Sequence, residues 1–338
     1  MTQARDIVVI GGSAGAIEAL TDLLGRLPDD LGAAFLVVIH TFPVAESLLP
    51  EVLSRRSRMD AGVAVEGEPI LCDRIYVAPP DCHLLVEPGR VRLSSGPKES
   101  GHRPAIDPLF RSAARSYGER LIAVVLSGTL DDGSTGLRLV RRQGGTAIVQ
   151  DPAEALFSQM PRNAIENAQP HHVAGLAGIA SLIVSHVGSV SRPGGAPGIM
   201  NGEVEAVSPN GGEAPVGAED APGTPSGIAC PDCHGVLWAP TDDESADFRC
   251  RVGHAYSPES LLDAHSASLE SSLWAGLRAL REQASLALHL AGKAQKRGDA
   301  SSAARFEDRA EDASHHASQM EALLLSRTPH EVRDRAAG

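Results

Sequence analysis

The feature that most constrains the fold is a short apolar run that breaks into glycines just before an amphipathic stretch. Residues 7–10 read Ile-Val-Val-Ile, residues 11–16 read Gly-Gly-Ser-Ala-Gly-Ala, and an amphipathic segment follows over residues 17–27. This order predicts a strand, a tight turn and a helix. Such a turn presents one side chain, here Ser13, beside the first free N–H groups of the helix, and its glycines let a substrate approach the backbone. A nucleophile and an oxyanion pocket can therefore share one loop.

The N-terminal half of the chain alternates short apolar runs with segments of helical length. Runs rich in Val, Ile and Leu and separated by helices are typical of a parallel sheet covered on both faces. The runs at 84 and 91 are separated only by Pro-Gly-Arg and indicate a hairpin. We therefore expect an α/β domain over residues 1–188, with a doubly wound, mainly parallel sheet and a β-hairpin appendage. The expected strands are residues 7–10, 34–39, 74–77, 84–87, 91–93, 121–126, 146–149 and 172–174.

Composition excludes several classes of protein. No run approaches the roughly 20 apolar residues of a membrane span, and the start of the chain has no signal-peptide pattern, so we expect a cytoplasmic protein without direct membrane insertion. The 338 residues carry a formal net charge of −13 and no cluster of Lys and Arg, which argues against nucleic-acid binding. Five cysteines in a chain of this length do not suggest a disulfide scaffold.

Further polar side chains follow two other apolar runs. His40 comes directly after the run 34–39, and Asp131 and Asp132 stand in a glycine-flanked turn after the run 121–126. Carboxyl ends of parallel strands meet at one edge of a sheet, so Ser13, His40 and a carboxylate can converge there. A serine becomes nucleophilic when a histidine oriented by a carboxylate takes its proton. The same residues also fit a capping serine, a structural histidine and an ordinary turn.

A dinucleotide site is another use of a glycine-rich turn after a first strand. It requires the pattern G-x-G-x-x-G and an acidic residue after the second strand. This chain has Ser13 or Ala14 where the second glycine belongs, and His40 where the acid belongs. We therefore expect no nucleotide cofactor, and a nicotinamide-dependent enzyme is the least favoured interpretation. The order Ser, His, Asp, without a G-x-S-x-G elbow, also differs from that of the α/β-hydrolases.

Six segments, taken in order, resemble the catalytic domain of the CheB-type protein-glutamate methylesterases. They are residues 10–15, 38–40, 76–83, 102–110, 126–133 and 160–165, and the resemblance covers nearly all of residues 5–187. It implies that Ser13 is the nucleophile, His40 the general base and Asp132 the orienting acid, with no cofactor for catalysis. It also implies hydrolysis of glutamate methyl esters on chemoreceptor-like helical proteins, with glutamine deamidation as a second activity.

The chain departs from the family pattern around two loops. The family usually has Ser-Thr-Gly-Gly at the nucleophile and Gly-Met-Gly-Asn-Asp-Gly at the acid, where this chain has Ser-Ala-Gly-Ala and Gly-Thr-Leu-Asp-Asp-Gly. Leu130, in place of glycine, is expected to narrow the oxyanion pocket. An alternative function is therefore a catalytically weak or inactive CheB-like signalling adaptor that binds helical partners. The residues expected to form the oxyanion pocket or line the substrate crevice are Gly12, Ala14, Thr129, His102, Arg103 and Arg162.

The match to the family begins at residue 5, so we expect no receiver domain ahead of it and a different mode of regulation. After the catalytic domain, residues 189–227 are dominated by Gly, Pro, Ser and acidic residues and predict a flexible linker.

A small metal-binding module is predicted over residues 228–257. Cys230 and Cys233 form one pair, and Cys250 and His254 form a second pair, which together supply the four ligands of a structural zinc ion. A module this small would lack a sufficient core without the metal. His234 is an alternative fourth ligand. The two remaining cysteines are expected to be packing residues.

The last predicted part is a helical hairpin, or coiled coil, over residues 258–328, with its turn at residues 297–299. In its second helix, Ala303, Phe306, Ala310, Ala313, Ala317, Met320 and Leu324 advance by alternating steps of three and four, the spacing of a coiled-coil seam. Its first helix carries Leu262, Leu269, Leu273, Leu277 and Leu280 on one face. Such a hairpin can support self-association, or it can dock on the long helical hairpin of a receptor.

Overall fold

The computed structural model describes residues 6–40, 48–57, 59–187, 224–239 and 247–326. The chain divides into two compact units, residues 1–261 and 262–338. Residues 189–223 of the expected linker lie outside the described residues. The last four residues of the expected linker, 224–227, instead begin a strand. The backbone of Thr224 and Pro225 pairs with Ala239 and Trp238, and such backbone pairing needs no apolar side chains.

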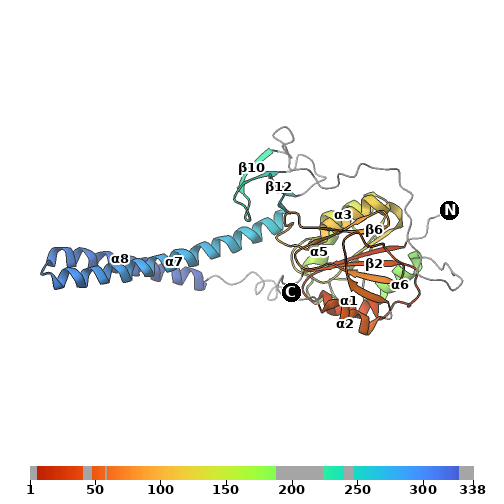
Figure 1. Ribbon diagram of the computed structural model, residues 1–338, viewed down its shortest axis with the longest axis horizontal. Coiled ribbons are helices and arrows are strands. Elements are labelled where there is room, and N and C mark those ends of the chain that lie inside the picture. The colour runs from red at the N-terminus through yellow and green to blue at the C-terminus, as the bar shows by residue number, and fades with distance from the viewer. Residues whose placement is uncertain (1–5, 41–47, 58, 188–223, 240–246, 327–338) are drawn as a thin grey trace. The chain divides into compact units, whose positions relative to one another are not determined.

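A parallel sheet of seven strands forms the centre of the first unit (Figure 1), in the order β3-β4-β2-β1-β7-β8-β9. The strands are β1 (Ile7–Gly12), β2 (Ala34–Ile39), β3 (Asp60–Val63), β4 (Arg74–Val77), β7 (Leu121–Val125), β8 (Thr146–Gln150) and β9 (His172–Ala174). The chain winds outward from β1 through β2 and later returns beside β1 as β7. The doubly wound α/β fold is therefore confirmed, and its winding changes direction between β1 and β7. Strand β3 was missed because its Asp-Ala-Gly-Val sequence has no apolar run.

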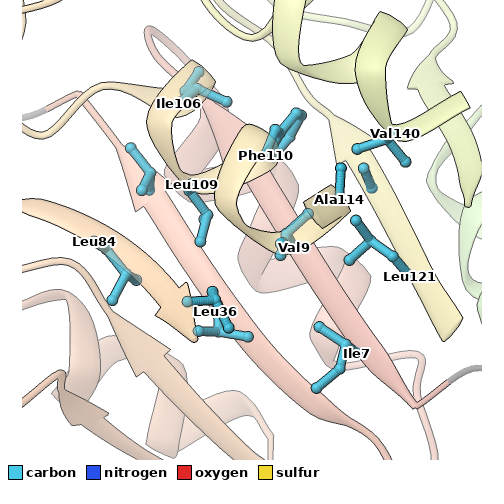
Figure 2. Packing of buried hydrophobic residues seen from close by; sticks show 14 of the residues in the cluster. Ile7, Val9, Leu36, Leu84, Ile106, Leu109, Phe110, Ala114, Leu121 and Val140 are labelled. Atoms are coloured by element: carbon cyan, nitrogen blue, oxygen red, sulfur yellow. The ribbon is translucent and has the colours of Figure 1, made fainter. Parts of the chain in front are cut away.

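Helices cover both faces of this sheet (Figure 1). One face carries α1 (Ala16–Leu24), α2 (Leu49–Arg56) and α6 (Leu176–Val187), and the other carries α3 (Ile106–Tyr117), α4 (Ser134–Arg142) and α5 (Gln159–Ala168), with a short 3-10 turn at Gly118–Arg120. Figure 2 shows Ile106, Leu109 and Phe110 of α3 lying against the sheet beside Val9 and Leu36. These five side chains are fully buried, and burying each contributes about 1.5–3 kcal/mol. The packing fixes the first turn of α3 at the carboxyl edge of β1.

The predicted hairpin is present as β5 (His83–Glu87) and β6 (Arg90–Ser94), paired antiparallel. It packs against α3, where Ser112 Oγ accepts a hydrogen bond from the N–H of Val86 at 3.0 Å.

A second, four-stranded sheet surrounds the cysteine motif. It consists of β10 (Thr224–Ala229), β11 (Val236–Ala239), β12 (Phe248–Cys250) and β13 (Ala255–Tyr256), paired antiparallel. Among its described residues, the buried side chains are Leu237, Ala255 and Tyr256 besides two of the cysteines. This core is too small to hold the module together without a further crosslink.

The second unit is an antiparallel helical hairpin formed by α7 (Pro258–Lys296), whose first turn belongs to the first unit, and α8 (Ala300–Ser326). The described seam follows the predicted spacing: Ala303, Ala310, Ala313, Ala317 and Leu324 are buried. The predicted face of α7 is interrupted at Leu262 and Leu269, which are 70% and 52% exposed. Helix α7 has 39 residues and α8 only 27, so α8 ends before it can cover the start of α7. None of the described helices is long and apolar enough to cross a membrane.

Candidate active site

Ser13 lies in the turn between β1 and α1, at the carboxyl edge of the sheet. The turn closes through Gly15, whose φ of 71° lies in the left-handed region. The backbone N–H of Ser13 donates to the carbonyl of Ser127 at 3.0 Å. In the part of the chain that the structure describes, the N–H of Ala14 has no hydrogen-bond partner. The turn thus presents a hydroxyl and a free N–H side by side.

The two glycines at the end of β1 are required by close packing within the protein. A Cβ at Gly11 would lie 2.3 Å from Cγ2 of Ile106, and one at Gly12 would lie 2.5 Å from Cβ of Ala16. The sequence pattern predicted that these glycines let a substrate approach the backbone. Here they let the N-termini of α1 and α3 come close to the strand that carries Ser13.

His40 and Asp132 form a buried hydrogen-bonded pair. Nε2 of His40 lies 2.7 Å from Oδ2 of Asp132, and the two side chains are only 6% and 2% exposed. The carboxylate also accepts hydrogen bonds from the N–H groups of Ile106 at 2.7 Å and Asp107 at 3.0 Å, in the first turn of α3. Burial alone would raise the pKa of Asp132, but the hydrogen bond and charge of His40 and the N–H of Ile106 outweigh it and lower the pKa. Asp132 is therefore an ionised acceptor.

This pairing assigns the proton on the histidine ring. Because Asp132 is ionised, Nε2 of His40 carries the hydrogen and Nδ1 presents its lone pair. Nδ1 is buried, and among the described residues it has no hydrogen-bond partner. A buried acceptor without a partner is rare in native proteins and is typical of a functional site. It is the atom available to receive a proton.

His102 stacks on this ring, with centroids 3.8 Å apart and an angle of 7° between the planes. Its Nδ1 lies 2.7 Å from the carbonyl of Ser100. Burial, followed by the proximity of His40, lowers the pKa of His102 to about 4. His102 is therefore neutral near pH 7 and can cover His40 without repelling an imidazolium formed there.

Ser13 and His40 are brought together by the register of their strands. Gly12 of β1 pairs with Ile39 of β2, and the N–H of His40 donates to the carbonyl of Gly12 at 3.1 Å. Among the described residues, no hydrogen bond joins the Ser13 hydroxyl to His40. Such bonds are often long in unliganded enzymes and tighten when substrate binds.

The turn after β7 lies against Ser13 from the other side. A Cβ at Gly128 would lie 3.0 Å from Cβ of Ser13. Thr129, next in the chain, is half-buried, and its N–H has no hydrogen-bond partner within the described ranges. The N–H groups of Ala14 and Thr129 thus come from the two loops that flank the hydroxyl.

The two arginines expected to line the crevice differ in their surroundings. The guanidinium of Arg103 donates to Asp81 at 2.7 Å and to the carbonyls of Ser95 and Gly96 at 2.9 and 2.7 Å. It ties together the loops beside the hairpin, so its donors already have partners within the protein. The side chain of Arg162 is exposed on α5.

Two further polar residues support the site, and neither was predicted from the sequence. Oε1 of Gln150 accepts from the N–H of Ser127 at 2.9 Å and fixes the turn after β7. Oδ1 of Asp107 accepts from the N–H of Gly136 at 2.5 Å, and burial followed by repulsion from Asp132 raises the pKa of Asp107. Gln150 could have been found from the sequence, because it is a polar residue at the end of an apolar strand. The burial of Asp107 in the first turn of α3 leaves no such signal in the sequence.

The four predicted metal ligands come together in the second sheet. Their ligand atoms all lie within 4.8 Å of one another. The distance is 3.6 Å between the sulfurs of Cys233 and Cys250, and Nδ1 of His254 lies 3.4 and 3.7 Å from the sulfurs of Cys250 and Cys230. A tetrahedral zinc ion with bonds of about 2.3 Å to sulfur and 2.0 Å to nitrogen requires ligand separations of roughly 3.5–3.8 Å. The geometry therefore fits zinc.

This fold and the polar groups along one edge of its sheet define a doubly wound α/β domain with a candidate hydrolytic site. Comparison with known proteins gives its family. The CheB methylesterase family model matches residues 8–183, just over half of the chain. A provisionally named protein-glutamate methylesterase/protein-glutamine glutaminase of Leptospira interrogans is 37% identical over 180 residues, which are 53% of this chain and 93% of that protein. A second relative, from Anaeromyxobacter dehalogenans, has the same activity in its name and is 39% identical over 161 residues, 48% of this chain and 47% of that protein.

A solved structure agrees with this assignment. The Thermotoga maritima CheB methylesterase catalytic domain is 31% identical, has a TM-score of 0.52, and aligns over 54% of this chain and 99% of that domain. The chain therefore belongs to the CheB methylesterase family, and the predicted resemblance is confirmed. It is a carboxylic ester hydrolase of the protein-glutamate methylesterase class.

Proposed function

We propose that this chain hydrolyses glutamate methyl esters on chemoreceptor-like helical proteins through a triad of Ser13, His40 and Asp132. The observation that carries the proposal is the bond from His40 Nε2 to Asp132, which leaves Nδ1 of His40 as a buried base beside the Ser13 turn. The substrate and partner class follows from membership of the family.

The reaction has two acyl-transfer steps. Ser13 Oγ attacks the ester carbonyl carbon while Nδ1 of His40 takes the hydroxyl proton. His40 then gives that proton to the departing methanol, which leaves an ester between Ser13 and the glutamyl group. A water molecule, deprotonated by His40, cleaves this ester and regenerates the serine. Asp132 stays ionised throughout and stabilises the imidazolium that forms in each step.

The negative charge on the reacting oxygen needs donors on the opposite side from the base. The N–H groups of Ala14 and Thr129 supply them in this proposal, and Gly12 lines the same turn. The N-terminus of α1, which starts at Ala16, adds a favourable dipole. Deamidation of glutamine follows the same steps, with ammonia leaving in place of methanol. No cofactor is needed for either reaction.

Methanol release from methylated receptor membranes tests this proposal. Ser13→Ala and His40→Ala should each lower turnover by roughly 10³-fold or more, because the oxyanion donors alone provide only residual catalysis. Ser181→Ala, an exposed helical serine, is the matched control and should leave the rate unchanged. Wild-type rates in both active-site variants would contradict the triad.

A non-catalytic adaptor is the second candidate, favoured by the missing Ser13–His40 bond and by the left-handed φ of 62° at Leu130. A fluorophosphonate probe separates the two, because only an activated hydroxyl reacts quickly. Labelling of Ser13 at the rate of denatured protein would favour the adaptor.

The second module has a structural role in this proposal. Cys230, Cys233, Cys250 and His254 hold one zinc ion with no open coordination position, as expected for a structural site. All five cysteines are free thiols in this structure, which suits a reducing compartment, so we propose that the protein acts in the cytoplasm.

The helical hairpin is the proposed docking element for helical partners. Its apolar side chains exposed to solvent include Leu269, Trp274, Leu286, Leu288, Leu323 and Leu325. A receptor hairpin or a second copy of the chain can cover these exposed side chains.

A further inference from the structure

The loop that carries the catalytic aspartate contains a strained residue. Leu130, two positions before Asp132, has a φ of 62°, a conformation that costs free energy for any side chain with a Cβ. Its N–H makes only a long contact of 3.3 Å, to Oε1 of Gln159. Something outside the loop must therefore hold it in place.

Two residues that follow the metal cluster support the loop at this strained position, one directly and the other through Asn163. Ser257 Oγ donates to Oδ1 of Asp131 at 2.6 Å, and both residues are buried. Nδ2 of Asn163 lies 3.0 Å from the carbonyl of Leu130 and 2.5 Å from Oε2 of Glu259. Ser257 thus contacts the loop directly, whereas Glu259 reaches it through the side-chain amide of Asn163.

The same segment also reaches the second loop beside His40. The N–H of Ser100 donates to the carbonyl of Ala255 at 2.7 Å, and Ser260 Oγ lies 3.4 Å from Ser100 Oγ. The carbonyl of Ser100 in turn accepts from His102, whose ring stacks on His40. Residues 255–260 thus touch both loops that enclose the catalytic imidazole.

The metal cluster is placed to fix this segment. Cys250 and His254 enclose the turn between β12 and β13, and Arg249 pairs with Ala255 across it. Near this turn, Asp247 accepts from Thr135 Oγ1 at 3.2 Å. The module is thereby anchored to the first turn of α4, which follows the aspartate loop.

We propose that residues 255–260 are a strut of the esterase site, with Ser257 and Glu259 as positioning residues that hold the aspartate loop against the strain at Leu130. This inference rests on the proposed esterase activity. If residues 255–260 hold the aspartate loop in this way, the module that contains the metal cluster helps to position the residues of the esterase site.

Turnover and amide hydrogen exchange, measured on the full zinc-loaded chain, test the proposal. Ser257→Ala should lower kcat by about tenfold with little change in KM, since the triad loses alignment while the substrate surface stays intact. Exchange at residues 129–135 should accelerate, because the loop loses a buried hydrogen bond. Ser272→Ala removes an exposed hydroxyl from the same helix and should change neither measurement.

Rescue distinguishes a strut from a general loss of stability. Ser257→Thr keeps the hydroxyl and should retain most of the activity. Leu130→Gly removes the cost of the left-handed conformation, so it should restore kcat in the Ser257→Ala background to within about threefold of wild type. Unchanged or raised kcat in Ser257→Ala, or failure of Leu130→Gly to rescue it, would overturn the proposal.

The exchange measurement keeps the strut separate from the esterase assignment. If the wild type releases no more methanol than Ser13→Ala, the proposed function fails, yet faster exchange in Ser257→Ala would still support the strut. Exchange at residues 129–135 that matches wild type would refute the strut whatever the activity.

Discussion

Asp131 and Asp132 are neighbours in sequence, but their surroundings move their pKa values in opposite directions. For Asp132, burial would raise the pKa, but the hydrogen bond and charge of His40 and the N–H of Ile106 outweigh it and lower the pKa. For Asp131, burial is the largest influence and raises the pKa to about 7; the hydrogen bond from Ser257 opposes the rise, and the charges of Glu259, Asp132 and Asp247 add to it. Only Asp132 is therefore equipped to orient the imidazole.

The raised pKa of Asp131 predicts a pH-dependent stability. The folded protein binds a proton on the Asp131 carboxyl more tightly than the unfolded chain does. The stability that this tighter binding gives to the folded state is complete below about pH 4 and is lost as pH rises towards 7. Asp131→Asn keeps an oxygen that accepts from Ser257 and carries no charge. It should raise the free energy of unfolding at about pH 8 by an amount of order 1–4 kcal/mol, with little effect near pH 4.

Guanidinium unfolding at the two pH values measures this difference. Asp263→Asn, an exposed aspartate on α7, is the matched control and should show no such pH dependence. A gain for Asp131→Asn that is the same at both pH values would mean that Asp131 is ionised throughout.

The residues of the proposed active site lie at the ends of helices and strands. Strands β1 and β2 end at Gly12 and Ile39, one residue before Ser13 and His40, and the first turn of α3 supplies the N–H groups that bind Asp132. The cluster proposed to bind zinc follows the same principle, because its side chains lie in or next to the turns that follow β10 and β12. Its small sheet has too little core to hold those turns without the metal.

Metal removal should therefore unfold the second sheet. We expect about one zinc ion per chain by elemental analysis, and Cys230→Ser should abolish it because three ligands no longer close the site. Residues 224–257 should then become sensitive to protease. Cys82→Ser changes a thiol outside the cluster and should retain the metal. Full zinc content in Cys230→Ser would show that the cluster is not the metal site.

At the scale of the whole molecule, the chain combines an esterase domain with elements that its family match does not cover. The family model ends at residue 183, whereas the metal cluster and the long helices follow it. Ser257 and Glu259 contact the esterase domain and lie in the first unit, which ends at Leu261. The unit that contains the esterase domain therefore also includes the module with the Cys/His cluster.

A chain ending after Leu261 should separate catalysis from docking. It keeps the contacts from Ser257 and Glu259, so its turnover on a small ester should stay within about twofold of the full chain. It should lose retention on methylated receptor membranes, because the exposed leucines of α7 and α8 are removed. Full-length Ser13→Ala is the control for retention without turnover. Equal retention of the shortened chain would exclude docking through the hairpin.

Much of the architecture could be predicted from local sequence pattern. Runs such as residues 34–39 are apolar because both faces of a central strand are buried, and the seam of α8 repeats because a helix presents one face. Spacing also predicted the grouping of four cysteine and histidine side chains, since a short turn brings Cys250 and His254 together. The strand ends placed Ser13 and His40 on one edge, because all strands of the sheet run in the same direction.

Local sequence therefore predicted the fold, the order of the segments that meet at the sheet edge and the grouping of the cysteine and histidine side chains, all of which depend on residues close along the chain. Tertiary structure alone decided that His40 offers Nδ1, that Arg103 is tied to Asp81, and that Ser257 holds Asp131. The last pair is separated by 126 residues. Such contacts arise from the packing of whole elements, and no local periodicity encodes which polar groups that packing brings together.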